Sequence, residues 1–327
     1  RLRAPRSLFF ARLPALRGCF CRKRTKKRET CAENARRRSR PYVRRETAQT
    51  RGVENGNENT KKAAFSPSLQ KNIEAVKAIL PSEDIFVHAF SAADGGECAV
   101  IYADGITDKA NLGELVLRPL SETAAPRSAD EAQKILCFPE SRAAEDVPSA
   151  CDEILAGNPL LLIDGAAGGV ILGTKQVAAR AVTEPQTSIT VKGPREGFIE
   201  EIKVNMGLIR KRLPSSALRF TTLRVGRKSR TAVCVAYLDG IADEKVVRAI
   251  EERIRAVDID GVPDSSYIAK FLAQKPLSLF KQVGTTEKPD ILCAKLLEGR
   301  VAVLADGSPI ALTLPYMLAE DFQSSQD

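Results

Sequence analysis

The sequence has no tryptophan, a single histidine and no long apolar run, and each of these absences argues against a class of function. With His88 alone, catalysis by paired histidines lacks its usual residues. No stretch reaches the roughly 18 uninterrupted apolar residues that suggest a membrane span. The nearest stretch, Pro159–Gly173, is short and is broken by Asp164 and several glycines. We therefore expect neither histidine-based chemistry nor a spanning helix in these 327 residues.

Eight cysteines are present, but their spacing predicts neither disulfides nor zinc. Cys19 and Cys21 lie too close together for a framework, and the other six are scattered along a large chain. No pair has the C-x-x-C spacing that is typical of zinc sites, and histidine ligands are nearly absent. Cys234 and Cys293 fall in apolar runs. We expect free, buried thiols in a reducing compartment and no bound metal or cofactor.

The net charge of +9 is unevenly distributed. Residues 1–62 hold 20 Lys and Arg against 5 Asp and Glu, a net of +15, which leaves 30 against 36, a net of −6, for residues 63–327. We expect residues 1–64 to form a disordered basic tail, since they contain few large apolar residues. Such a tail either touches acidic lipid or RNA, or is a solvated extension or sequence translated from a misplaced start. The acidic remainder argues against a nucleic-acid groove in the folded part.

An internal repeat organises the rest of the chain. A helical pattern at Leu69–Leu80 ends in Pro-Ser, and so does a second one at Phe198–Leu213. Two strand-like runs follow each helix, and each copy closes with another strand pair around Asp-Gly. We predict an α/β (α+β) fold of two similar subdomains. Its predicted parts are the tail at 1–64, a first subdomain at 65–174, a linker at 175–197 and a second subdomain at 198–327.

Asp-Gly pairs occur at four matching places, Asp104, Asp164, Asp239 and Asp306. Glycine accepts positive φ, so each pair predicts a turn. The first and third pairs precede helices that Asp108 and Asp243 would cap, and the other two pairs would close hairpins. A catalytic aspartate at a strand end is the alternative interpretation, but it has no histidine partner. Residues 165–169 resemble a phosphate loop without the Lys-Ser/Thr and the helix it needs.

The junction between the copies contains the run Gly193–Phe198. Acidic residues begin the helix that follows and Arg210–Arg212 end it, an order that suits the helix dipole. Helix electrostatics explains those charges, but it does not explain Arg195 and Glu196 between two glycines. We interpret that pair as a candidate latch between the subdomains.

A series of distinctive residues runs through the junction and the second copy. With the latch candidates, they are Gly193, Pro194, Arg195, Glu196, Gly197, Asn205, Arg210, Arg227, Asp239, Gly240, Asp260, Glu287, Pro289, Asp290, Glu298 and Arg300. The motifs that they form resemble the GerA family of spore germination proteins, the A subunits of germinant receptors. The resemblance covers about residues 66–327. Residues 323–327 match the stretch ahead of the family's transmembrane region. Two departures stand out: Lys288 replaces the usual Arg, which puts a bidentate salt bridge in doubt, and Phe280-Lys281-Gln282 replaces Phe-Pro-Gln.

This resemblance implies a non-enzymatic, soluble N-terminal region on the cytoplasmic side of the spore inner membrane, followed by transmembrane helices. A sequence that begins without Met fits a fragment of such a protein. Family members work with B and C subunits, sense nutrients such as amino acids or sugars, and take part in the ion release that begins germination. We also expect A subunits to associate with one another through the full-length protein.

Three other functions remain open at this point. The family's accessory branch, the stage V sporulation protein AF type, would amplify ion flow rather than sense a nutrient. A nucleic-acid-binding protein would act through the basic tail, and its binding would be sensitive to salt. An enzyme would have to rely on carboxylates such as Asp258 and Asp260, which more simply close a turn.

Overall fold

The computed structural model describes most of the chain beyond the predicted tail. The described residues are 64–136, 138, 140–174, 194–273, 281–317 and 320. Nearly all of the predicted tail, the linker up to Gly193 and the C-terminal motif at 323–327 lie outside them. These described residues all belong to one compact unit. We call residues 64–174 the first half, and residues 194–317 with Glu320 the second half.

The first half is built on a five-stranded sheet with the order β1-β2-β4-β5-β3, in which all neighbours are antiparallel. Its elements in chain order are α2 (Leu69–Ile79), β1 (Ile85–Ser91), β2 (Glu97–Ala103), α3 (Lys109–Leu112), the π-helical turn η1 (Gly113–Leu117), α4 (Arg118–Glu122), α5 (Ala129–Leu136), β3 (Ser141–Ala144), α6 (Val147–Leu155), β4 (Leu160–Ile163) and β5 (Gly169–Leu172).

The second half repeats this plan with the sheet order β6-β7-β9-β10-β8, again antiparallel throughout. Its elements are α7 (Ile202–Arg212), β6 (Leu218–Val225), β7 (Thr231–Leu238), α8 (Glu244–Arg255), α9 (Ser265–Leu272), β8 (Gly284–Thr286), α10 (Pro289–Leu297), β9 (Val301–Ala305) and β10 (Ala311–Leu314). Strand for strand, the two orders are the same. The predicted fold class, with two similar α/β units, is confirmed.

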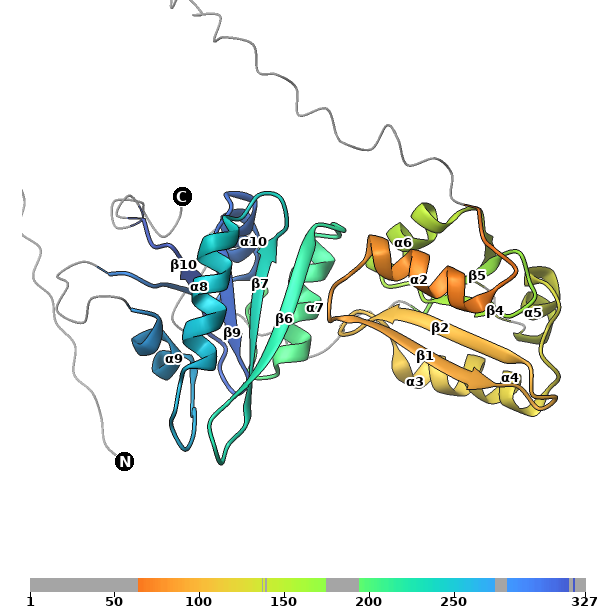
Figure 1. Ribbon diagram of the computed structural model, residues 1–327, viewed down its shortest axis with the longest axis horizontal. Helices are drawn as coiled ribbons and strands as arrows, with labels where there is room; N and C mark the ends of the chain where they lie inside the picture. The colour runs from red at the N-terminus through yellow and green to blue at the C-terminus, as the bar shows by residue number, and fades with distance from the viewer. Residues whose placement is uncertain are drawn as a thin grey trace, which may run out of the picture. The chain divides into compact units, whose positions relative to one another are not determined.

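Each half has helices on both faces of its sheet. In the first half α2 and α6 pack on one face, and α3, η1, α4 and α5 pack on the other, as Figure 1 shows for the labelled helices. In the second half α7 and α10 share one face, while α8 and α9 share the other. The central strands are buried on both faces, which explains why they read as continuous apolar runs.

Two features of the halves differ from what the sequence patterns suggest. The edge strands β3 and β8 were not predicted, because Ser-Arg-Ala-Ala and Gly-Thr-Thr are short and only partly buried. The weak helical pattern after Asp108 forms three short pieces, α3, η1 and α4. Gly113 opens the π-helical turn and Pro119 lies at the start of α4, and both residue types disfavour one continuous helix.

All four Asp-Gly pairs form the predicted turns, with φ between 76° and 82° at their glycines. Asp108 and Asp243 cap α3 and α8 with their side chains, also as predicted. Asp164 and Asp306 have a further role. Asp164 Oδ1 accepts the amide of Leu69 at 3.0 Å, and Asp306 Oδ1 accepts that of Ile202 at 3.2 Å. The last hairpin of each half thus caps its first helix.

Candidate functional site

The most specific polar contacts between the halves form along a seam, which we define as the contact of residues 82–84 and 104–105 with α7 and β6. Strand β6 is an edge strand, and edge strands present unpaired amides. Here Phe220 N donates to Ser82 Oγ at 3.1 Å and Thr222 N donates to Glu83 Oε2 at 2.6 Å. Glu83 N donates to Phe220 O at 3.4 Å. The first half therefore covers the edge of the second sheet.

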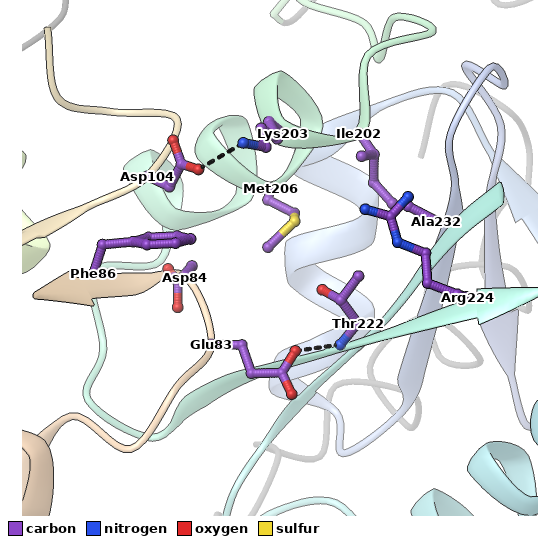
Figure 2. Close-up of a pocket in the computed structure, with 10 residues that line it drawn as sticks. All are labelled: Glu83, Asp84, Phe86, Asp104, Ile202, Lys203, Met206, Thr222, Arg224 and Ala232. Atoms are coloured by element: carbon purple, nitrogen blue, oxygen red, sulfur yellow. Dashed lines mark hydrogen bonds and ion pairs between the residues drawn. The ribbon is translucent and has the colours of Figure 1, made fainter. Parts of the chain in front are cut away.

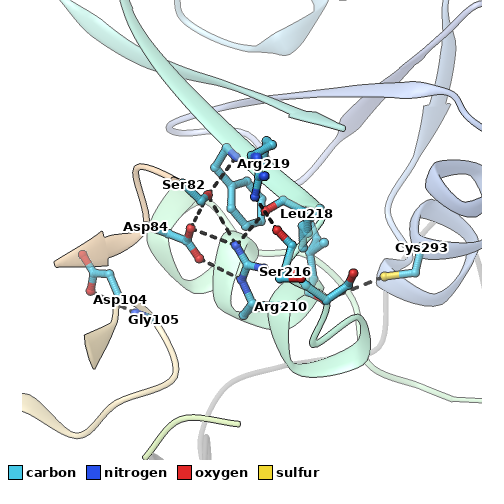
Figure 3. Close-up of polar contacts among 12 residues, drawn as sticks. Ser82, Asp84, Asp104, Gly105, Arg210, Ser216, Leu218, Arg219 and Cys293 are labelled. Carbon is cyan, nitrogen blue, oxygen red and sulfur yellow. Dashed lines mark hydrogen bonds and ion pairs between the residues drawn. The ribbon is translucent and has the colours of Figure 1, made fainter. Parts of the chain in front are cut away.

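A buried ion pair lies at the centre of the seam (Figure 3). Arg210 Nε and Nη2 donate to the two carboxylate oxygens of Asp84, each at 2.9 Å, and both side chains are 1% exposed. The guanidinium also donates to Ser215 O at 2.8 Å and to Leu218 O at 3.2 Å. It lies over the ring of Phe220, 5.1 Å from the centroid. The flat fork of arginine suits this two-pronged carboxylate contact.

Two glycines bring the halves into backbone contact beside this pair. A Cβ on Gly207 would lie 2.4 Å from Gly105 O, so α7 approaches the first half closely only because residue 207 has no side chain. Asp104 precedes that turn and pairs with Lys109 at 2.5 Å and with Lys203 at 3.2 Å. Burial opposes ionisation of Asp104, but the hydrogen bonds and charges of the two lysines outweigh it and hold its pKa below the ordinary value.

A hollow of about 310 Å³ opens along the seam and takes side chains from both halves (Figure 2). Its walls carry both signs of charge next to apolar surface, a mixture that suits a small polar molecule. The lining residues are Glu83, Asp84, Phe86, Asp104, Ile202, Lys203, Met206, Thr222, Arg224 and Ala232. Among the described residues no cluster of three or more His, Cys, Asp or Glu could hold a metal ion.

Asn205 and Arg210, two of the residues singled out in the sequence, are both buried on α7. Arg210 belongs to the seam, whereas Asn205 supports its own half. Asn205 Oδ1 accepts the amide of Ile199 at 2.8 Å, and Nδ2 donates to the carbonyl of the same residue. Asn72 makes the same pair of bonds to Ser66 in the first half.

The candidate latch lies ahead of α7. Gly193 falls outside the described residues, Pro194 and Arg195 are exposed, and Gly197 is buried. Glu196 pairs with Arg212 at 2.5 Å and with Lys211 at 3.6 Å, which ties the junction to the last turn of α7 within the second half. A latch at Arg195 and Glu196 stays a prediction, while Asp84 with Arg210 and Asp104 with Lys203 form ion pairs across the seam.

Arg227, Asp239, Gly240 and Asp260 lie in loops of the second half. Arg227 pairs with Asp260 at 3.2 Å on the surface, joining the β6–β7 turn to the loop after α8. Asp239, half-exposed, pairs with Arg219 at 3.1 Å, and Gly240 makes the turn after β7. The four Asp-Gly aspartates thus have structural partners. The hypothesis of a catalytic aspartate gains no geometry from them.

The remaining five predicted residues surround α10. Glu287 O accepts the amide of Phe198 at 2.8 Å, and Pro289 and Asp290 occupy the first turn of the helix. Arg300, which follows the helix, pairs with Glu298 at 2.8 Å and with Glu320. Lys288, which departs from the family pattern, is itself buried, and its amide donates to Thr286 Oγ1 at 3.2 Å. These residues therefore join α10 to the junction and to the end of the described chain.

The cysteines of the described core are not placed for reactivity. Cys98, Cys151, Cys234 and Cys293 are buried and free. Burial raises the pKa of Cys98 and Cys293 to about 11 and that of Cys151 to about 12, and raises that of Cys234 further still. Thiols with such pKa values stay protonated at neutral pH and are poor nucleophiles.

Sequence reasoning missed Ser82, Asp84 and Gly207, which complete the seam. A comparison of the two copies contains the signal. Asp84 matches Ala217 in the second copy. Gly207 is a glycine inside a helix, where glycine lowers stability, so its presence suggests that another part of the chain approaches closely there. At Asp84 and Gly207 a departure from the repeat marks a place where the halves meet, whereas Ser82 matches Ser215 and carries no such signal.

A family model described as Bacillus/Clostridium GerA spore germination protein matches residues 71–327. Among curated relatives, the membrane protein YfkQ of Bacillus subtilis is 34% identical over 80% of this chain and 52% of its own length. Spore germination protein B1 of the same organism is 32% identical over 79% of this chain and 55% of its own length. Stage V sporulation protein AF is 28% identical over 75% and 51%.

A solved structure shows the same fold. The N-terminal domain of the A subunit of the Bacillus megaterium spore germinant receptor GerK3 superposes with a TM-score of 0.61 at 24% identity, covering 79% of this chain and 98% of that domain. This chain spans about half the length of the curated relatives named above. No helix in the part described here has the length and apolar character needed to cross a membrane. The match of the family model over both halves shows that the chain belongs to the GerA family of spore germination proteins.

Proposed function

We propose that this chain is the non-enzymatic N-terminal region of a germinant receptor A subunit, on the cytoplasmic side of the spore inner membrane. It would support nutrient sensing, assembly with B and C subunits and gating of ion release. One observation carries the proposal: the family model matches residues 71–327, which include the second half, the seam and the first half from Lys71 onward. The resemblance of the fold to the GerK3 A-subunit domain supports it.

Two halves that meet at a small polar seam could move relative to each other and so transmit a conformational change. Relative movement of two compact units is a common way to transmit binding to another part of a protein. In this role the seam would hold the halves together, and the second half would pass the change to the segments that follow. Disrupting the full-length gene in its own spore former tests the role. Loss of ion release for one nutrient and not for others is expected, and ion release unchanged for every nutrient would contradict it.

We propose the hollow at the seam as the place where a nutrient would bind, if this region binds one. Glu83 and Asp104 offer carboxylates, Lys203 and Arg224 offer cations, and Met206 lies between them in Figure 2. An amino acid carries both charges and a sugar carries many hydroxyl groups, so either fits this chemistry. Calorimetry of the 327-residue chain against a panel of amino acids and sugars tests the site. Absence of heat with every ligand would rule out a nutrient site here.

The accessory branch is the second candidate, because stage V sporulation protein AF is also a relative. An accessory protein would amplify ion flow for many nutrients, so its loss would slow the response to all of them. Neighbouring genes separate the two roles: B and C subunit genes accompany a receptor, and the stage V genes accompany the accessory. The disruption experiment gives the same distinction through the number of nutrients affected.

A further inference from the structure

The two equivalent helices α2 and α7 present different chemistry on matching faces. On α7, Lys203, Gly207 and Arg210 follow one another at helical spacing and contact the first half. The matching face of α2 carries polar and charged residues at every position, and all of them are exposed. These residues are Gln70, Glu74 and Lys77. The copies therefore share a fold, but of these two helices α7 is the one whose face packs against the other half.

The partner of that face also exists in one copy alone. Asp84 stands in the first half where Ala217 stands in the second, so the repeat offers one carboxylate and one buried guanidinium that meet across the seam. Removing either partner leaves a charge without its counterion in a site that is 1% exposed. The pair thus favours a single arrangement of the halves strongly over slightly shifted ones.

Each side of the ion pair is held ready by its own half. Arg210 donates to Ser215 O and Leu218 O, which belong to the second half and remain beside it when the halves separate. Asp84 accepts a hydrogen bond from Ser82 Oγ, and its carbonyl accepts the amide of Asp104 at 2.8 Å. Closure therefore orders few additional side chains, which lowers the entropy cost of joining the halves.

We propose that Asp84 and Arg210 form a lock that holds the halves in one closed arrangement, and that opening the lock parts the walls of the hollow. Glu83 and Asp84 line the hollow from the first half, and Lys203 and Met206 line it from the second. Separation of the pair accordingly divides the hollow. This lock adds to the proposed function a contact that controls access to the hollow. Its role in sensing rests on the proposed function, whereas the contacts of Asp84 and Arg210 do not.

Two amides of β6 report directly on the lock. Phe220 N and Thr222 N donate to acceptors of the first half, so they lose their partners when the halves separate. The amides of Thr221 and Leu223 alternate with them along the strand and point toward β7. These two amides therefore stay hydrogen-bonded as long as the second half is folded. Residue-resolved hydrogen exchange by NMR on the 327-residue chain reads both sets at once.

The test compares two lock variants, Arg210→Met and Asp84→Asn, with the control Lys77→Met. Like Arg210→Met, the control replaces a cationic side chain with methionine, but at the matching position of α2. Exchange at Phe220 and Thr222 is expected to accelerate at least about tenfold in the first two variants, with Thr221 and Leu223 unchanged. Lys77→Met should leave all four amides as they are. Equal exchange at Phe220 and Thr222 in the lock variants and in the unaltered chain would overturn the proposal.

A variant that simply unfolds is recognised because Thr221 and Leu223 also lose protection. If Arg210→Met does so, the decision rests on Asp84→Asn, which keeps the shape of the side chain but removes its charge and replaces one of the two acceptor oxygens with an NH2 group. Unchanged exchange of Phe220 and Thr222 in that variant overturns the lock. Failure of the receptor role alone would appear as unchanged ion release after gene disruption, while Phe220 and Thr222 still exchange faster in the lock variants, so the two failures are distinguishable.

Discussion

The first and second halves share one sheet order, yet their equivalent helices α2 and α7 present different surfaces. In the first half the outer face of α2 is solvated, and the loop after it projects Asp84. In the second half the equivalent face of α7 is buried against the first half. Gly207 lets the two backbones approach there, and Arg210 is buried beside it. The comparison teaches that the fold and the joint between the halves are encoded at separate positions. A repeat can keep its scaffold while a few residues turn two copies into one assembly.

The scaffold positions are those that the halves share. Asn72 and Asn205 tie the segment ahead of α2 or α7 to the helix, and Asp164 and Asp306 cap the same two helices. The joint depends on positions that differ, such as Asp84 against Ala217 and Gly207 against Glu74. Substitutions at shared positions should therefore have matching effects in both halves, and substitutions at joint positions should not.

The largest effect at shared positions is expected for the two buried asparagines. Asn72→Ala and Asn205→Ala each leave a backbone amide and a carbonyl without partners, which costs roughly 2–3 kcal/mol of unfolding free energy. Urea unfolding of the 327-residue chain measures both, with the exposed Gln70→Ala as the control. Similar losses in the two halves support a shared scaffold. A large loss in one half only would show that the halves are stabilised differently.

Gly207→Ala is expected to give the next largest effect, and its sign is diagnostic. In a solvated helix the change would stabilise the protein by about 1 kcal/mol, because alanine favours helix. At the seam the new Cβ would collide with Gly105 O, so we expect a loss of about 1–3 kcal/mol. Glu74→Ala at the matching position of α2 should change stability little. Stabilisation by Gly207→Ala would mean that the halves are not in contact there.

How far the sequence predicted this molecule follows from the same distinction. The strands around Asp-Gly, the turns and the repeat were predictable because each depends on neighbouring residues, as in Tyr102–Asp108 and Tyr237–Asp243. The seam was not predictable, since Asp84 and Arg210 lie 126 residues apart and local patterns carry no record of which surfaces meet. Arg210 was singled out by resemblance to the family, without its partner. The latch at Arg195 and Glu196 stays a prediction.

The helix caps on the last hairpins should have smaller effects. Asp164→Ala and Asp306→Ala each remove the acceptor for the first amide of α2 or α7, at a cost of about 1 kcal/mol. Exchange of the Leu69 and Ile202 amides should rise in the corresponding variant only. Asn substitutions, which preserve an acceptor, serve as controls and should restore most of the loss. Equal stability of the Ala variants and the unaltered chain would show that these caps do not stabilise the helices.

The smallest effect is expected from acid. Asp104 at the seam and Glu320 near the end of the described chain both have pKa values below the ordinary range. Burial opposes ionisation in each case, but Lys109 and Lys203 outweigh it at Asp104. At Glu320 it is outweighed by Lys295, the amide of Met317 and Arg300. Their contribution is fully present above about pH 4–5, where both carboxyls ionise even when unfolded, and it is lost as pH falls through the lowered pKa values.

Thermal unfolding between pH 6 and pH 3 measures this loss. Asp104→Asn should reduce the acid sensitivity, modestly because Lys109 and Lys203 are about half-exposed. The Asp152→Asn variant, at an exposed carboxylate of α6, controls for general charge effects. Acid sensitivity that is the same in Asp104→Asn as in the unaltered chain would exclude Asp104 as its source.

A double-mutant cycle of Asp84→Asn and Arg210→Met tests the central claim most directly. If the two residues lock the halves, each single substitution leaves the other partner uncompensated. The double variant should then lose about 2 kcal/mol less than the sum of the single losses. Urea unfolding gives all four free energies, with Lys77→Met replacing Arg210→Met in a parallel cycle that should show no coupling. Additivity within about 0.5 kcal/mol in the first cycle would contradict the lock.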